Sequence, residues 1–424
     1  MDPRESLPTS PDAARARLVT ELRARDVGLT RTVQNAFARV PRHIFVPEVG
    51  PAAAYRDEAL VIKCGPDGLP VSSSSQPAMM AIMLEQLDLG RGHRVLEIGT
   101  GSGYNAAVMA EVVGPGGQVV SIDIDPELVA RAEASLNEAG YFDVSVLRAD
   151  GGYGAPGDAP FDRIIVTAGA WDIAPAWLDQ LGPGGRLVLP LSLRGMQLSV
   201  ALERAGEAWV SKSAWRCGFV PMLGDFAGPE RVFRLDEPQP LVAQMSDGSP
   251  IDGPALRHAL TGPATHVGAR APVGLSEIAD LDLWLTLTSR DLARLTVLAA
   301  PGGWLALAPL LPVGGLIGHA TDPGRIGVAI LVPTETASDG PVGPSAPPRV
   351  AFSGLGPGGA TIAAWLADMT IEWAARGRPG AHELELTVRP TGVGPEPASP
   401  GAHVSPGAYV MRRPSVTIQA GWPE

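Results

Sequence analysis

Residues 94–104 read Arg-Val-Leu-Glu-Ile-Gly-Thr-Gly-Ser-Gly-Tyr, and the organisation of the chain follows from this stretch. It begins as a short apolar run with the β-branched residues Val95 and Ile98, which is typical of a buried strand. Glycines then occupy alternate positions at 99, 101 and 103, and a helical run follows over residues 105–113. This order predicts a nucleotide-binding βα unit, because glycines let the backbone approach a ligand and the first turn of a helix offers free N–H groups.

Two acidic residues indicate the kind of nucleotide. A dinucleotide fingerprint requires a third glycine at position 104, where this chain has Tyr104. Glu97 lies within the strand instead, and a second predicted strand over residues 119–122 leads into Asp123, where a carboxylate can bind a ribose diol. This pattern of one acid, three glycines and a downstream acid resembles the S-adenosylmethionine site of class I methyltransferases, whose ligand carries no phosphate. A glycine turn with a purely structural role is the alternative.

Composition bounds the class of protein. The 424 residues favour two domains, and a hydrophobic content of 45% indicates a globular protein with substantial cores. The net charge of −12, from 45 acidic and 33 basic residues, argues against general binding to nucleic acid or to an anionic membrane. Two cysteines are too few for a disulfide framework or a zinc site, and we expect no metal site. Because no apolar run reaches membrane-spanning length, we expect a cytoplasmic protein.

Alternating strands and helices between residues 94 and 190 predict an α/β fold with a parallel, doubly wound, Rossmann-like sheet. Ligands of such sheets bind at the carboxyl ends of the strands, where residues 99–103, Asp123, Asp150 and residues 167–169 are expected to meet. Two further helices are predicted over about residues 10–25 and 30–39. We therefore assign residues 1–235 to a methyltransferase domain that includes these N-terminal helices.

Five motifs, in this order, resemble the protein-L-isoaspartate O-methyltransferase family. They are Val-Pro-Arg-His-Ile-Phe-Val-Pro at 40–47, Ser-Gln-Pro at 75–77, Val-Leu-Glu-Ile-Gly-Thr-Gly-Ser-Gly-Tyr at 95–104, Phe-Asp-Arg-Ile-Ile-Val-Thr-Ala at 161–168 and Leu-Gly-Pro-Gly-Gly-Arg-Leu-Val at 181–188. The resemblance covers about residues 15–225, half of the chain. It implies an enzyme that uses S-adenosyl-L-methionine to esterify a side-chain carboxylate, and a peptide or protein partner that carries aspartate or isoaspartate.

The resemblance also implies a role for individual residues. Ser75 matches the active-site serine of the family, and its neighbours Ser73, Ser74 and Gln76 are expected to contact the substrate. Asp123 would hold the ribose, and Asp150 with Gly151 would flank the adenine. The full set of expected cofactor contacts is Glu97, Gly99, Thr100, Gly101, Gly103, Asp123, Ile124, Asp150, Gly151 and Thr167.

The chain departs from the family pattern in two ways. The active-site serine is the last of four serines, at 72–75, where the family usually has an apolar residue before it, and the chain continues far beyond the usual end of the family near residue 235. These features resemble actinobacterial relatives associated with ribosomally made peptides such as lanthipeptides and graspetides. Those enzymes methylate an aspartate in a precursor peptide, and the ester collapses to an aspartimide that persists or hydrolyses to isoaspartate.

The second half predicts an α+β domain over residues 254–424, after a Pro-rich linker at 236–253. The expected strands lie at 282–287, 304–308, 327–332, 349–352, 382–388 and 415–418, and the expected helix at 360–376 places Ile362, Trp365, Leu366, Met369 and Trp373 inward. We expect this domain to recognise or clamp a peptide.

Three functions remain open from the sequence. The first is an O-methyltransferase that tailors a ribosomally synthesised peptide, and the second is a general repair enzyme for isoaspartate in many proteins. The third is a methyltransferase-like protein without catalysis or with a small-molecule substrate. The first two use one active site and differ in substrate, since a repair enzyme should accept short isoaspartyl peptides and a tailoring enzyme should require its precursor. An oligomeric state does not follow from any of them.

Overall fold

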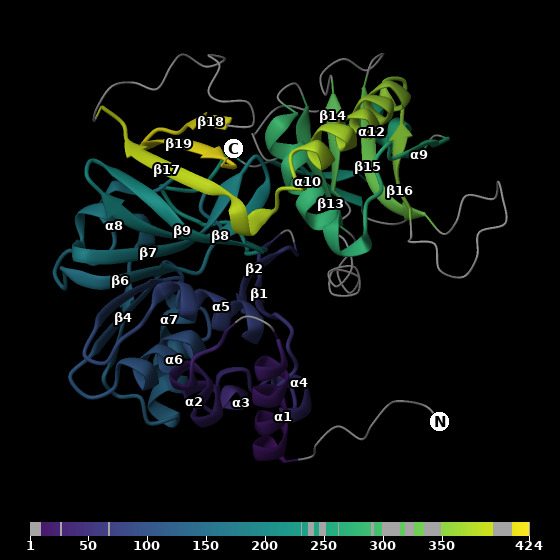
Figure 1. Ribbon diagram of the computed structural model, residues 1–424. Coiled ribbons are helices and arrows are strands. Elements are labelled where there is room, and N and C mark those ends of the chain that lie inside the picture. Colours follow the sequence, from purple (N-terminus) through teal and green to yellow (C-terminus); the bar gives the residue numbers. More distant parts are fainter. Residues whose placement is uncertain are drawn as a thin grey trace.

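The computed structural model describes residues 10–25, 28–66, 68–229, 231–235, 241–245, 252–261, 263–289, 292–298, 314–318, 326–334, 349–392 and 409–423. These residues form two lobes, each built on one large sheet (Figure 1). The methyltransferase lobe holds a 10-stranded sheet of order β18-β19-β17-β9-β8-β7-β6-β3-β4-β5. The accessory lobe holds a 7-stranded sheet of order β10-β11-β13-β14-β15-β16-β12.

The parallel part of the methyltransferase sheet confirms the predicted α/β fold. β3 pairs in parallel with β4 on one side and β6 on the other, while β5 and β7 extend the two flanks. The carboxyl ends of these strands therefore meet at one edge, as in other doubly wound sheets. The strands are β3 (Arg94–Ile98), β4 (Gln118–Asp123), β5 (Val144–Arg148), β6 (Phe161–Val166) and β7 (Leu181–Leu193).

Helices and apolar side chains cover both faces of this sheet. Successive residues of a strand point to opposite faces, so Val95 joins the cluster formed with the N-terminal helices while Leu96 joins the cluster that contains Trp177. The predicted N-terminal helices are present, the first capped by the Ser10 side chain and the second by Thr30. The helices are α1 (Pro11–Ala24), α2 (Arg31–Arg39), α3 (Arg42–Phe45), α4 (Pro51–Ala54), α5 (Pro77–Leu87), α6 (Tyr104–Val113), α7 (Pro126–Glu138) and α8 (Pro175–Asp179).

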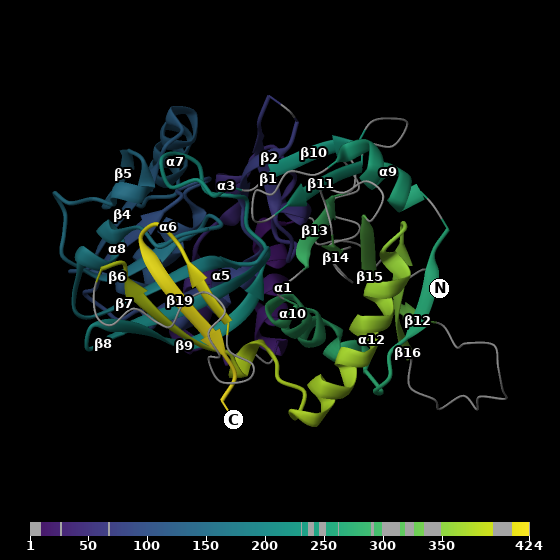
Figure 2. The same ribbon diagram turned by 90° about the horizontal axis from the view of Figure 1, so that it is seen from above.

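The far end of the chain returns to the methyltransferase sheet, which corrects the expected domain boundaries. After the antiparallel strands β8 (Met196–Ala205) and β9 (Ala208–Cys217), the next strand is β17 (Glu385–Pro390), followed by β19 (Val416–Gly421) and β18 (Tyr409–Arg412). Figures 1 and 2 both show these last strands against β9. The strands β17, β18 and β19 thus belong to the first lobe, and the accessory lobe is inserted between β9 and β17 of its sheet.

The accessory lobe is antiparallel, as expected for its α+β class. The long helix α12 (Gly359–Ala375) packs on its sheet and buries Ile362, Leu366 and Trp373, whereas Trp365 is 42% exposed, so its predicted inward position is wrong. Its other elements are β10 (Arg231–Leu235), β11 (Leu241–Met245), α9 (Gly253–Thr261), β12 (Thr265–Gly268), α10 (Ile278–Thr288), β13 (Ala293–Leu298), β14 (Gly314–Gly318), β15 (Gly327–Thr334) and β16 (Arg349–Leu355).

The accessory lobe differs from the sequence-based expectations at its start and at α10. The linker predicted at 236–253 contains β11, and β10 lies within the range assigned to the methyltransferase domain, so the lobe begins by residue 231. The strand predicted at 282–287 is part of the helix α10. The strand predicted at 304–308 lies outside the described residues.

The two lobes share a polar contact around α10. Arg194 donates to the carbonyl oxygens of Thr286 at 3.1 Å and Ser289 at 2.9 Å, at the end of this helix. Asp282 of α10 pairs with Arg294, and its Oδ2 lies 3.7 Å from the guanidinium of Arg216 on β9. These contacts join the accessory lobe to the strand that leads toward the candidate site.

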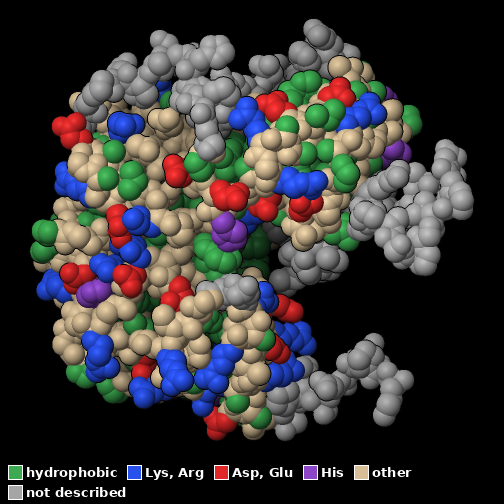
Figure 3. Space-filling model, viewed as in Figure 1, with side chains coloured by type: hydrophobic (Ala, Val, Ile, Leu, Met, Phe, Trp, Pro, Cys, Tyr) green, Lys and Arg blue, Asp and Glu red, His purple; other side chains and the backbone are tan. Residues whose placement is uncertain are grey.

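On the face drawn in Figure 3, the described acidic and basic side chains are intermingled over both lobes. Within the described part of the chain, no helix combines the length and the apolar character needed to cross a membrane.

Candidate active site

The main cleft of the methyltransferase lobe lies at the carboxyl ends of the parallel strands. It encloses about 1040 Å³, including the space at its mouth. Its walls come from segments that are far apart in the sequence: the ends of β3, β4 and β6, the serines before α5, and residues 219–223 after β9. Of the predicted site residues, the cleft is lined by Ser73, Ser74, Ser75, Glu97, Gly99, Thr100, Gly101, Asp123, Ile124, Gly151 and Thr167.

The glycine turn needs glycine for its backbone conformation. Gly99, Gly101 and Gly103 have φ values of +100°, +53° and +84°, which L-residues with side chains rarely adopt. A Cβ atom at Gly99 would also lie only 2.6 Å from Oγ1 of Thr167. That hydroxyl donates to the carbonyl of Gly99 at 2.7 Å and so ties the end of β6 to the turn. Of the three glycines, Gly103 lies outside the lining and forms the N-cap of α6.

Glu97 is the most deeply buried acid of the cleft, with no exposed surface. Burial raises its pKa to about 7, although Ser121 and Asn105 donate to the carboxylate at 2.5 and 2.8 Å and oppose that rise. The carbonyl oxygen Oδ1 of Asn105 is buried with no hydrogen-bond partner among the described residues. The floor of the cleft thus offers a carboxylate and an unpaired acceptor to a ligand that brings hydrogen-bond donors or a positive charge.

Asp123 stands at the end of β4, with one carboxylate oxygen bonded to the glycine turn and the other to the N-cap residue of α7. It accepts from the backbone N–H of Gly101 at 3.0 Å and from that of Asp125 at 3.1 Å. Burial raises the pKa of Asp123, and the two N–H donors oppose that rise. A carboxylate oxygen has two lone pairs, so each oxygen keeps acceptor capacity for a hydroxyl of the ligand. Ile124 follows on the same wall and is 38% exposed, which leaves its side chain available for apolar contact.

The serine run forms the opposite wall. β1 (Leu60–Cys64) and β2 (Pro70–Ser74) make a two-stranded ribbon, and alternation along β2 buries Ser72 and Ser74 while Ser73 is half-buried. The Ser75 hydroxyl, just past the ribbon, has no hydrogen-bond partner among the described residues, whereas Arg42 donates to the Ser74 hydroxyl at 3.4 Å. The end of the ribbon and the residue after it thus place Ser73, Ser74 and Ser75 along the cleft.

Besides Gly103, two predicted residues lie outside the lining of the cleft, Gln76 and Asp150. The side-chain amide of Gln76 donates to the carbonyl oxygen of Asp57 at 3.0 Å, and its substrate contact remains a prediction. Asp150 accepts from the N–H groups of Gly152 at 2.9 Å and Asp225 at 2.8 Å, so it fixes the loops next to the cleft. Its contact with the adenine also remains a prediction.

Sequence reasoning missed one wall. Residues 219–223 line the cleft because Gly169 pairs with them: its N–H donates to Val220 at 2.8 Å, and it accepts from Met222 at 3.0 Å. These residues are mostly apolar and carry no motif that marks a ligand site. Their position follows from a bridge between two distant loops, which no local pattern in the sequence reveals.

These residues fit S-adenosylmethionine. The buried Glu97 and the unpaired acceptor of Asn105 suit the charged methionine end, Asp123 suits a ribose, and the glycine turn admits a ligand against the backbone. The positive charge of this ligand also matches the acids, which would repel a pyrophosphate. Fold and cleft together define a class I S-adenosylmethionine-dependent methyltransferase.

Comparison with known proteins defines the family. The model of the protein-L-isoaspartate(D-aspartate) O-methyltransferase family matches residues 13–226, half of the 424-residue chain. The chain therefore belongs to this family and is an S-adenosylmethionine-dependent carboxyl methyltransferase. The family acts on isoaspartyl peptides and proteins.

Relatives of known sequence match the same half of the chain. It is 44% identical over 216 residues to protein-L-isoaspartate O-methyltransferase 2 of Archaeoglobus fulgidus, a match that covers 51% of this chain and 95% of the relative. Identity to the protein-L-isoaspartate O-methyltransferase of Methanopyrus kandleri is 43% over 221 residues, with the same shares covered.

A solved protein-L-isoaspartate O-methyltransferase structure has a TM-score of 0.49 at 24% identity, covering 88% of this chain and 96% of that one. Another solved structure, described as a beta-aspartate methyltransferase from Plasmodium falciparum in complex with S-adenosyl-L-homocysteine, has a TM-score of 0.44 at 20% identity. It covers 49% of this chain and 98% of that one.

Proposed function

We propose that this enzyme methylates an aspartate side chain in a ribosomally made peptide, and that the accessory lobe recognises that peptide. The observation that carries the proposal is the wall formed by the serine run, where Ser73 and Ser74 line the cleft beside the proposed active-site Ser75 and make this wall polar. The family resemblance implies an apolar residue at position 74. The accessory lobe supports it, because this lobe is inserted into the methyltransferase fold and contacts β9, the strand before the wall formed by residues 219–223.

In this proposal each part of the cleft has one task. Glu97 and Asn105 hold the methionine end of S-adenosylmethionine, Asp123 holds its ribose, and Gly151 and Ile124 lie beside its adenine. When bound, this group supplies a methyl carbon activated by a sulfonium. The apolar residues 219–223 help to exclude water from the reacting atoms.

Ser75 has the task of orienting the substrate carboxylate. An aspartate side chain has an ordinary pKa near 4 and is ionised at neutral pH, so it attacks without a general base. The Ser75 hydroxyl would donate a hydrogen bond to one carboxylate oxygen and leave the other oxygen to accept the methyl group that S-adenosylmethionine would supply. The ester product then loses methanol when the next backbone amide nitrogen attacks its carbonyl, which closes a succinimide.

A repair enzyme for isoaspartate is the second candidate. Its support is the identity of 44% and 43% to archaeal relatives named protein-L-isoaspartate O-methyltransferase, across most of their length. The two candidates share the residues of the cleft and differ in the peptide that they accept.

Mass spectrometry distinguishes the two candidates. The full-length enzyme is incubated with S-adenosylmethionine and either a short synthetic isoaspartyl peptide, the same peptide with ordinary aspartate, or the candidate precursor encoded next to this gene. Tailoring predicts a transient methyl adduct on the precursor, followed by net loss of one water, and little methylation of the isoaspartyl peptide. Comparable efficiency on the isoaspartyl peptide overturns the tailoring proposal and supports repair.

A further inference from the structure

Arg42 of α3 is a buried charge with an unusual set of partners. Its side chain has no exposed surface, and among the described residues it forms no ion pair with a carboxylate. It donates instead to carbonyl oxygens on two separate segments. Nη1 reaches Arg56 at 3.0 Å, and Nη2 reaches Glu58 at 3.2 Å and Ser75 at 3.0 Å.

This arrangement is unfavourable for the arginine itself. Burial lowers the pKa of Arg42, because a charged group loses its hydration, and the Nε atom has no hydrogen-bond partner. The Tyr104 ring, whose centroid is 5.6 Å from the guanidinium carbon, offsets part of the loss. An apolar residue would fill this space without the desolvation penalty. An apolar residue could not, however, donate hydrogen bonds to the backbone carbonyls of Ser74 and Ser75.

Asp57 holds the other side of the same turn. Its side chain is 9% exposed, and it accepts from the backbone N–H of Ala78 at 2.8 Å and from the amide of Gln76 at 3.2 Å. Arg25 donates to the same carboxylate. Helix α5 has no cap from its own N-cap side chain, so Asp57 binds an N–H of its first turn from a distant loop.

Two opposite charges therefore hold the chain on both sides of Ser75. Arg42 binds the carbonyls of residues 74 and 75, and Asp57 binds the N–H of Ala78. From this geometry we infer that Arg42 and Asp57 are positioning residues, which hold the Ser75 hydroxyl toward the substrate carboxylate. The inference rests on the proposed role of Ser75 and adds the device that fixes its orientation. Neither positioning residue lines the cleft.

A double-mutant cycle tests this inference. Initial rates of methyl transfer are measured for the wild type, Arg42→Lys, Ser75→Ala and the double variant, on whichever of the peptides above the wild type methylates. Loss of a hydrogen bond to a charged group predicts a fall of about ten- to a hundredfold in kcat for Ser75→Ala. We expect Arg42→Lys to lower kcat about tenfold, since one ammonium cannot bind carbonyls on two segments, with KM changed less than threefold. In the Ser75→Ala background the same substitution should change kcat less than twofold.

Hydrogen exchange provides a readout that does not depend on activity. In the complex with S-adenosylhomocysteine, Arg42→Lys should raise amide exchange of residues 74–76 and 78 at least tenfold and leave that of β4 unchanged. Asp57→Asn should raise amide exchange at the same residues, and this variant replaces Arg42→Lys in the test if the latter does not fold. Arg39→Lys is the matched control, because Arg39 is an exposed arginine on the neighbouring helix that pairs with Glu111.

The outcomes separate this inference from the proposed function. The positioning role is overturned if Arg42→Lys lowers kcat by the same factor in the wild type and in the Ser75→Ala background. It is also overturned if amide hydrogen exchange at residues 74–76 and 78 is unchanged. Either result leaves the role of Ser75 intact. If Ser75→Ala alone retains the wild-type rate, the proposed role of Ser75 falls, and the positioning inference falls with it.

Discussion

At the scale of single residues, the protonation of Glu97 should control cofactor affinity. Its pKa of about 7 is above the ordinary value, so the folded chain holds this proton until the pH rises through about 7. Without ligand, the unfolding free energy therefore falls as the pH rises from about 4.5 to 7, because the folded state binds more protons there than the unfolded state. A ligand with a positively charged amino group prefers the carboxylate and should bind more tightly once Glu97 is ionised.

We predict that the dissociation constant of S-adenosylhomocysteine falls several-fold between pH 6 and pH 8. Calorimetric titrations at these values measure it, and the dependence should largely disappear in Glu97→Gln. Asp123 also has a raised pKa and faces the same cleft, so the comparison between the two proteins isolates the share of Glu97. An equal pH dependence in both proteins would contradict a contact between Glu97 and the amino group.

At the scale of elements, the ribbon of β1 and β2 covers one side of the glycine turn. A Cβ atom at Gly101 would lie 3.5 Å from the Ser72 hydroxyl and 3.9 Å from Ile62 Cδ1. Lys63 of β1 anchors the ribbon to the start of α7, where it binds Asp125 at 2.5 Å and Glu127 at 2.6 Å. The ribbon that carries the serine wall is thus tied through Lys63 to the cofactor side of the cleft.

Loss of this anchor should speed ligand exchange. We predict that Lys63→Met raises the dissociation rate of S-adenosylhomocysteine by up to about fivefold, a modest effect because partly exposed ion pairs are screened by water. Stopped-flow displacement measures the rate, and 0.5 M salt should bring the wild type toward the variant. Lys212→Met serves as control, since Lys212 forms a single surface pair with Glu203, at 3.8 Å, away from the cleft. An unchanged dissociation rate in Lys63→Met would contradict the proposal that the Lys63 ion pairs slow ligand release.

The elements also show where sequence patterns suffice. β3, the glycine turn and α6 were predictable, because strand, turn and helix are each encoded locally. Helix α10 was not, since Leu283 and Leu287 pack in the methyltransferase core while Leu281 and Trp284 pack in the accessory core. A helix buried on two sides loses the polar face that identifies it, and its apolar run resembles a strand. The cleft wall at residues 219–223 and the hydrogen bonds of Arg42 to the backbone near Ser75 could not be predicted for another reason. Both depend on contacts between segments that are distant in the sequence.

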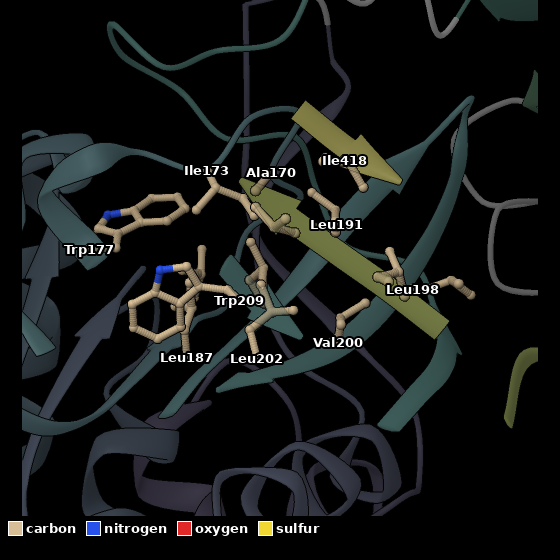
Figure 4. Close-up of a cluster of buried hydrophobic side chains, with 14 of the residues drawn as sticks. Ala170, Ile173, Trp177, Leu187, Leu191, Leu198, Val200, Leu202, Trp209 and Ile418 are labelled. Atoms are coloured by element: carbon tan, nitrogen blue, oxygen red, sulfur yellow. The ribbon is translucent and has the colours of Figure 1, made fainter. Parts of the chain in front are cut away.

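At the scale of the whole molecule, the accessory lobe is held at both ends by the methyltransferase sheet. The chain leaves this sheet after β9 and returns to it at β17, which pairs with β9 through Val388 and Trp209. The returning strands complete the core of the first lobe: Figure 4 shows Ile418 of β19 beside Leu191 and Ala170, in one buried cluster. The lobe that we propose to recognise the peptide is therefore connected at both ends to strands of the methyltransferase sheet, β9 and β17.

We therefore predict that the last strands, β17 to β19, stabilise the methyltransferase lobe that binds the cofactor. Ile418 has no exposed surface, so Ile418→Ala should lower the unfolding free energy of the methyltransferase lobe by about 2–5 kcal/mol. Ile371→Ala is the matched control: Ile371 on α12 is 56% exposed, and its loss should change that free energy by less than about 0.5 kcal/mol. Urea titrations that follow S-adenosylhomocysteine binding report on this lobe alone. If Ile418→Ala unfolds at the same urea concentration as Ile371→Ala, the last strands contribute nothing to the stability of the methyltransferase core.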